Sequence, residues 1–195
     1  MELNISINGL NSALLMLDGK KTVIPAARMA VNEAVTTGRA AYDKGVRRYW
    51  NLKTNITKKQ ITIGRKASNA TLTGIIRIQG RSIDLIKFGA KWKRGRITTT
   101  GTKSTFAKRS NRIGGVFVQI EKGKTTRLPH AFIARAGSHT GVFERAGKSR
   151  LPVRSKAVIT MASMVEQDRI SIPTMKQISD RMNTRFLHHM DRLLK

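Results

Sequence analysis

The sequence predicts an α+β fold, because helical and strand periodicities occupy separate parts of the chain. Apolar residues recur at helical spacing from Ile24 to about Trp50 and again from Met161 to Leu193. Between these stretches, apolar and polar residues alternate with a period of two. We therefore expect N-terminal helices, a small antiparallel β-sheet with a long basic loop, and a C-terminal helix. A length of 195 residues suits one domain over residues 1–195.

The N-terminal part of the chain predicts a strand followed by helices. Alternation over residues 3–7 indicates a short strand, and the leucines of residues 10–17 suit a short helix. The long helix begins near Thr22, a residue type that caps helix N-termini. Residues 57–60 (Thr-Lys-Lys-Gln) fit a capping box, which predicts a second short helix to about Lys66.

The middle of the chain predicts short antiparallel strands separated by turns. The expected strands are residues 70–78, 83–88, 116–120, 129–135 and 142–145. Residues 121–124 (Glu-Lys-Gly-Lys) are typical of a hairpin turn, and residues 137–141 are rich in turn formers. These strands are the source of the predicted sheet.

Helical periodicity returns at the C-terminus. A short helix is predicted near Met161, and Pro173 is expected to lie at the start of a longer one. The apolar face of that longer helix is expected to carry Met175, Ile178, Met182, Phe186, Met190 and Leu193. Such a methionine-rich face is more often core than an adaptable interface.

The charge of the chain indicates a polyanionic or acidic partner. There are 38 basic and 11 acidic residues, which give a formal net charge of +27. From Lys44 to Ile120 there are nineteen Lys or Arg residues and one acid, Asp84. Like charges at this density repel one another unless a partner of opposite charge neutralises them. A protein that works against nucleic acid or inside a large assembly fits this pattern better than an enzyme for small molecules.

The sequence offers no recognisable catalytic or metal site. The acids are scattered, whereas metal-dependent nucleases and acid–base pairs need carboxylates close together. His188 and His189 are adjacent, so on a helix they point about 100° apart and do not chelate one metal. His130 and His139 have no evident third ligand, and the chain has no cysteine. We expect no cofactor, no metal and no enzymatic activity.

The chain also lacks the patterns of secretion and membrane insertion. Its N-terminus has no basic flank followed by an apolar run, and no stretch approaches the roughly eighteen apolar residues of a membrane span. We expect a soluble protein that is made and used in the cytoplasm, without membrane contact.

A basic segment from Gly89 to Gly115 is the strongest candidate for a binding site. It holds eight Lys or Arg residues and no acid, and it is expected to be an extended loop. Aromatic side chains lie among the bases, so bases of a nucleic acid could stack while the cations neutralise phosphates. The alternative is a solvated loop that orders against a neighbouring subunit, and both roles stay open. The candidate contact residues are Lys91, Trp92, Lys93, Arg94, Arg96, Lys103, Lys108, Arg109 and Arg112.

Residues 39–66, with two predicted helices joined by a short polar stretch, superficially resemble a helix-turn-helix DNA-binding motif. The second helix is short and lacks a clear set of side chains that could reach base edges. Sequence-specific binding is therefore disfavoured.

Several stretches occur in an order that matches a known family. They are residues 46–56 (Val-Arg-Arg-Tyr-Trp-Asn-Leu-Lys-Thr-Asn-Ile), 83–90 (Ile-Asp-Leu-Ile-Lys-Phe-Gly-Ala), 128–133 (Leu-Pro-His-Ala-Phe-Ile), 141–145 (Gly-Val-Phe-Glu-Arg) and 147–153 (Gly-Lys-Ser-Arg-Leu-Pro-Val). Together with an Ala-rich helix after residues 7–10 (Ile-Asn-Gly-Leu), they resemble the minor tail protein Z family of lambda-like phages over nearly the full length. The matching strand and turn positions are Pro129, Phe132, Phe143, Arg145, Arg150 and Pro152. Residues 157–161 depart from the family, because they lack its Gly-Pro turn.

The resemblance implies a non-enzymatic virion protein that completes the head-proximal end of the tail or joins tail to head. It implies a ring, commonly six-fold, around the DNA channel. The implied partners are copies of the same chain, the tail terminator or tail-tube protein, head-completion or connector proteins, and packaged double-stranded DNA. The rival hypothesis is a free protein that binds nucleic acid non-specifically, and a nuclease is disfavoured by the missing carboxylate cluster.

Overall fold

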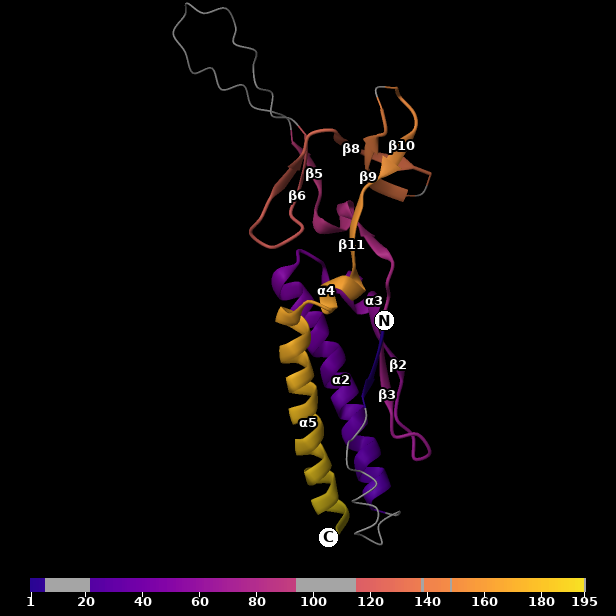
Figure 1. Ribbon diagram of the computed structural model, residues 1–195, viewed down its shortest axis with the longest axis vertical. Helices are drawn as coiled ribbons and strands as arrows, with labels where there is room; N and C mark the ends of the chain where they lie inside the picture. The colour runs from indigo at the N-terminus through magenta and orange to yellow at the C-terminus, as the bar shows by residue number, and fades with distance from the viewer. Residues whose placement is uncertain (6–21, 94–114, 138, 148, 195) are drawn as a thin grey trace, which may run out of the picture. The chain divides into compact units, whose positions relative to one another are not determined.

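The computed structural model describes residues 1–5, 22–93, 115–137, 139–147 and 149–194 (Figure 1). It confirms the α+β class, with long helices and antiparallel strands. The chain forms two compact units. Unit 1 comprises Met1–Arg48, Thr54–Arg81 and Ile159–Lys195, and unit 2 comprises Tyr49–Lys53 and Ser82–Val158.

Unit 1 is a pair of long helices with a small sheet against one of them. Its elements are β1 (Glu2–Ile5), α2 (Val23–Tyr49), α3 (Thr54–Gln60), β2 (Ile61–Arg65), β3 (Gly74–Ile78), α4 (Met161–Val165) and α5 (Asp168–Leu194). The sheet has the order β1-β3-β2, and both pairs are antiparallel. Figure 1 shows α5 alongside α2 over much of their length.

Small residues on α2 allow the other elements to approach it closely. A Cβ on Gly38 would lie 2.7 Å from Cδ1 of Ile178 on α5. The reciprocal case is Gly74 of β3, where a Cβ would lie 2.3 Å from Cγ2 of Val35 on α2. Glycine at these two positions lets helix and strand backbones pack at distances that a side chain would prevent. Fully buried alanines and valines recur along α2 three or four residues apart, on one side of the helix: Ala27, Ala30, Val31, Ala34 and Val35.

A buried polar cluster fixes α3 against α2. Asp43 of α2 is 7% exposed and pairs with Arg47, whose Nη2 lies 2.7 Å from Asp43 Oδ2. The hydroxyl of Thr57 on α3 donates a hydrogen bond to the other carboxylate oxygen. Because Asp43 is buried, its carboxylate depends on these donors to replace water.

Thr57 also explains why the predicted capping box is wrong. The helix begins at Thr54, so Thr57 lies inside it and its side chain points to Asp43. The predicted continuation to Lys66 is also wrong, because residues 61–65 form strand β2. Ile61 and Ile63 are β-branched residues, and both pair with β3, which favours a strand over a longer helix.

The start of the C-terminal helix differs from the prediction. The helix begins at Asp168, and Pro173 lies inside it. Ile170, Thr174 and Ile178 are buried at four-residue spacing, so the packed row starts before the proline. The predicted apolar face is correct at Ile178 and Met190, but Met175 and Leu193 are 47% and 39% exposed.

Unit 2 consists of short strands. Its elements are β4 (Ser82–Asp84), the 3₁₀ helix η1 (Leu85–Phe88), β5 (Lys91–Lys93), β6 (Gly115–Val118), β7 (Thr126–Leu128), β8 (Ala131–Ala136), β9 (His139–Arg145) and β10 (Val153–Ser155). The sheets have the orders β5-β6-β7 and β10-β9-β8, and β4 pairs with β11 (Ala157–Thr160) at the end of the unit. The hairpin turn predicted at residues 121–124 is confirmed between β6 and β7.

Several predicted strand and turn boundaries need correction. Strand β3 begins at Gly74 rather than at residue 70. The strand predicted at 83–88 ends at Asp84 and continues as η1, because Leu85 and Phe88 are both buried at the three-residue spacing of a 3₁₀ helix. β8 begins at Ala131, after a turn at residues 129–130, and the turn predicted at 137–141 is shorter because His139 already belongs to β9. The helix predicted at residues 10–17 lies outside the described residues.

Replacing Gly74 with alanine is expected to destabilise the protein. The new methyl group would overlap Val35, and overpacking of this kind typically costs about 1–3 kcal/mol. Urea unfolding measures the change in the free energy of unfolding. Gly80→Ala is the matched control, because a Cβ there meets nothing within 4 Å. Equal stability of the two variants would contradict the close packing of β3 on α2.

Replacing Asp43 with asparagine is expected to cost about 1–3 kcal/mol at neutral pH, because charge-assisted hydrogen bonds are lost. Burial raises the pKa of the Asp43 carboxyl, but hydrogen bonds from Arg47 and Thr57 and nearby positive charge outweigh it, so the pKa is lowered. A lowered pKa in the folded state means that the stabilisation is present above the ordinary value of about 3.9. It is lost as the pH falls through the lowered pKa.

The difference between wild type and Asp43→Asn should therefore be largest near pH 7 and shrink steadily below about pH 4. Urea unfolding at a series of pH values tests this. Asp191→Asn, at an exposed acid, should show little difference at any pH. A gap for Asp43→Asn that does not change with pH would show that the carboxylate charge is not what stabilises the cluster.

Candidate nucleic-acid interface

The three-stranded sheet β5-β6-β7 of unit 2 carries the described part of the predicted binding segment. Lys91, Trp92 and Lys93 form strand β5, so the segment is not a loop at this point. Among the described strands, β5 lies at the edge of its sheet and pairs with β6. The remaining candidates lie outside the described residues: Arg94, Arg96, Lys103, Lys108, Arg109 and Arg112.

The strand separates the cations from the tryptophan. Successive side chains of a strand point to opposite faces, so Lys91 and Lys93 share one face and Trp92 lies on the other. Lys91 is the partner of Phe117, whereas Trp92 is the partner of Val116. Trp92 therefore does not share a face with Lys91 and Lys93, and Phe117 is the aromatic residue on their face. Stacking of a nucleic-acid base on Trp92 stays a prediction.

Strand β7 adds a third cation to the same face. Arg127 is the partner of Phe117 in the β6–β7 pair and thus shares its face. We refer to Lys91, Lys93, Phe117 and Arg127 as the basic face. Its three basic residues are exposed and Phe117 is half-buried.

Two contacts define the geometry of the basic face. The Nζ atom of Lys93 lies 5.5 Å from the centroid of the Phe117 ring, within the range of a cation–π interaction. A Cβ on Gly115 would lie 3.4 Å from Nε of Arg127, so the Arg127 side chain crosses the site where Gly115 has none. Gly115 is the partner of Lys93, and Arg127 therefore reaches toward β5.

The opposite face of this sheet is apolar. Val116 and Val118 are 0% and 1% exposed, and β6 lies beside β8 and η1. Trp92 is on this side but at its margin, where 58% of its surface is exposed. An aromatic side chain of this size on an edge strand is a candidate contact for another protein chain.

The basic face has the chemistry of an anion-binding surface. Strands Lys91–Lys93, Gly115–Val118 and Thr126–Leu128 contain no Asp or Glu. Cations that share a sheet face without an acid between them repel one another. An external polyanion relieves this repulsion, and exposed lysine and arginine are the side chains that contact phosphates.

Sequence reasoning missed Phe117 and Arg127. The alternation of β6 does place Phe117 on the face away from the buried Val116 and Val118. However, residues 94–114 separate β5 from β6 in the sequence, and no local pattern indicates that these two strands pair. Arg127 follows the hairpin turn, and the hairpin register could have placed it beside Phe117.

The family-signature positions of β8, β9 and the turn after β9 form a structural cluster. Phe132 and Phe143 are cross-strand partners with ring centroids 6.2 Å apart, and the guanidinium of Arg145 lies 5.6 Å from the Phe132 ring. Pro152 follows a cis peptide bond, and its carbonyl accepts a hydrogen bond from the Ala146 N–H at 3.1 Å. Pro129 and Arg150 are exposed. These contacts stabilise the β8–β9 hairpin and the connection from β9 to β10.

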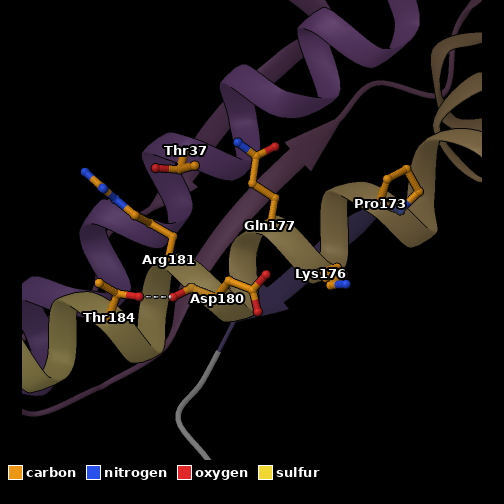
Figure 2. Close-up of a pocket in the computed structure, with 7 residues that line it drawn as sticks. All are labelled: Thr37, Pro173, Lys176, Gln177, Asp180, Arg181 and Thr184. Carbon is orange, nitrogen blue, oxygen red and sulfur yellow. Dashed lines mark hydrogen bonds between the residues drawn. The ribbon is translucent and has the colours of Figure 1, made fainter.

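The pocket shown in Figure 2 lies in unit 1 and is unlike a catalytic site. It has a volume of about 500 Å³, and Asp180 is the one acid among its lining residues. The carbonyl of Asp180 accepts a hydrogen bond from the Thr184 hydroxyl at 2.8 Å. The pocket is lined by Thr37, Pro173, Lys176, Gln177, Asp180, Arg181 and Thr184.

Basic residues of α5, among them Arg181 of the pocket lining, converge on one carboxylate of α2. Glu33 Oε1 lies 2.9 Å from Nε2 of His189, and its Oε2 lies 2.6 Å from Nε of Arg185 and 3.6 Å from Nη2 of Arg181. The cluster joins the two helices of unit 1. A lone carboxylate surrounded by cations lacks the second acid that general acid–base catalysis or a metal needs.

The described part of the chain contains no group of three His, Asp or Glu side chains that could hold a metal ion. None of the described helices has the length and apolar content needed to cross a membrane.

Comparison with known proteins gives one match. No curated protein and no solved structure matches the chain. The family model described as prophage minor tail protein Z (GPZ) matches residues 7–195, which is nearly the whole chain. The chain therefore belongs to the prophage minor tail protein Z family, and it is a structural component of a phage virion.

Proposed function

We propose that this protein forms a ring around the DNA channel at the head-proximal end of the tail, where it completes the tail and joins it to the head. The observation that carries the proposal is the division of β5 into two faces. Lys91 and Lys93 are exposed on one face, and Trp92 is exposed at the margin of the other. One short strand therefore offers a charged surface to DNA and an aromatic anchor to a neighbouring subunit.

The charge of the chain supports a position around DNA. Several copies with a net charge of +27 repel one another in a closed ring. Duplex DNA carries about one negative charge per 1.7 Å of its axis, so DNA in the channel offsets that repulsion. The basic segment of residues 89–115 is the part that we assign to this contact.

The ring requires heterologous contacts, in which one surface of a subunit meets a different surface of the next. Such contacts close into a ring when the rotation between subunits permits it. We propose a six-fold ring with further contacts to the tail terminator or tail-tube protein and to the head-completion proteins. We propose no enzymatic activity and no cofactor for this role. We further propose that the protein is assembled in the host cytoplasm and acts in the neck of the virion.

Particles made without this protein test the role directly. Electron micrographs should show complete heads and complete tails that are unjoined, or joined particles that do not infect. Native mass spectrometry of the purified chain, alone and with tail-tube or terminator protein, should show a ring or a joint assembly. A monomer that binds DNA tightly and has no affinity for phage proteins would instead support a free nucleic-acid-binding protein.

Replacing Trp92 with serine is expected to weaken the ring, because it removes the aromatic contact with the neighbour. Aromatic residues at the centre of an interface commonly contribute about 2 kcal/mol or more. Native mass spectrometry should show a shift toward monomers. Leu187→Ser is the matched control, since Leu187 is an apolar residue of α5 with a similar exposure of 65%. Rings of equal stability in both variants would exclude Trp92 as the anchor.

A further inference from the structure

We propose that the basic face binds duplex DNA through phosphates alone, with Phe117 holding the ammonium group of Lys93 in place rather than stacking on a base. The inference rests on the proposed function, because it names the residues and the mode of the DNA contact within the ring. Phe117 and Arg127 are the additions to the predicted set, and they lie on β6, which pairs with β5, and on β7, which pairs with β6.

The three cations act as one patch. Lys91 and Arg127 both oppose Phe117, from the strands on either side of it. Two strand spacings amount to about 10 Å, and the Debye length at physiological salt is about 8 Å. Because this separation slightly exceeds the Debye length, salt screens most of the repulsion between the two side chains, and the patch attracts a polyanion mainly at close range. Lys93 lies on the same face two residues from Lys91. A polyanion with closely spaced charges fits this patch better than a single carboxylate.

Phe117 is occupied by protein contacts. Its side chain is half-buried, and the Nζ atom of Lys93 lies over the ring at 5.5 Å from the centroid. A base-stacking platform needs an open aromatic face, and here the ammonium group covers it. The ring instead fixes the position of a long flexible side chain, which lowers the entropy that Lys93 loses when it meets a phosphate.

The exposed aromatic residue of β5 does not supply stacking at this face either. Trp92 is the partner of Val116 and points away from the basic face. A nucleic acid that contacts Lys91 and Lys93 therefore meets cations without a free aromatic surface. This combination suits a duplex, whose bases are already stacked and whose phosphates lie outside, and it gives no sequence preference.

Fluorescence anisotropy with the full-length protein tests the inference. The probes are a labelled duplex of about 25 base pairs and a single strand of equal length, at several salt concentrations between about 50 and 200 mM. Lys93→Gln and Arg127→Gln should each weaken duplex binding and lower the slope of log affinity against log salt by about 0.9. Phe117→Leu should weaken duplex binding about two- to five-fold, because the cation–π contact is lost while an apolar side chain stays.

Arg154→Gln is the control, since it removes one exposed charge of unit 2 on β10 and outside the basic face. If Lys93→Gln and Arg127→Gln bind the duplex as Arg154→Gln does, the inference is wrong, and an acidic protein surface becomes the better partner for this face. If Phe117→Leu loses single-strand binding but keeps duplex binding, Phe117 stacks on bases and the phosphate-only mode is wrong.

The two proposals fail in different experiments. Duplex binding that depends on the basic face, in a protein that forms no ring and joins no particle, would retain the inference and reject the proposed function. Rings and infectious particles made by Lys93→Gln and Arg127→Gln, with duplex affinity equal to that of Arg154→Gln, would retain the function and reject the inference.

Discussion

The architecture of unit 1 depends on the small side chains of α2. Gly38 admits Ile178 of α5 at a distance where a Cβ would overlap it, and Gly74 of β3 meets Val35 of α2 without a side chain of its own. Close backbone approach on two sides of one helix produces the core of this unit. The polar contacts of α2 complete it, because Glu33 receives three basic side chains from α5 and Asp43 receives Thr57 from α3. Glu33 thereby links α2 to α5, and Asp43 links α2 to α3.

Unit 2 depends on the period-two geometry of short strands. Buried Val116 and Val118 fix which face of β6 points inward, and the register with β5 and β7 then decides the faces of all other side chains. A shift of one residue would put Trp92 on the face of Phe117 and move Lys91 and Lys93 to the apolar side. Burial of the two valines is thus the interaction that creates the basic face, although neither valine reaches it.

The sequence was sufficient for the class of fold and for the long elements, because the periodicity of α2 extends over many turns and several strands are bounded by turn residues. The sequence-based predictions are wrong where tertiary contacts outweigh a local helix-start signal. Thr57 fits a capping box, yet its hydroxyl bonds to Asp43, fourteen positions earlier, and the helix begins before it. Pro173 suits the start of a helix, but the buried row from Ile170 extends the helix backward past it. The basic face was missed for a similar reason, since it joins strands separated by more than twenty residues, and no local pattern specifies that pairing.

Two sets of cations in the described residues differ in their surroundings. In unit 1, Arg47 pairs with Asp43, and Arg181 and Arg185 share Glu33, so each of these carboxylates offsets one positive charge within the fold. On the basic face of unit 2, the strands themselves contain no acid, and the Nζ atom of Lys93 lies 5.5 Å from the centroid of the neutral Phe117 ring. A cation held by an aromatic ring keeps its charge available, whereas one paired with a carboxylate does not. Pairing with a carboxylate stabilises the fold, whereas Lys91 and Lys93 keep exposed charge on one side of a small sheet, and this exposed charge is why we propose a polyanionic partner for the basic face.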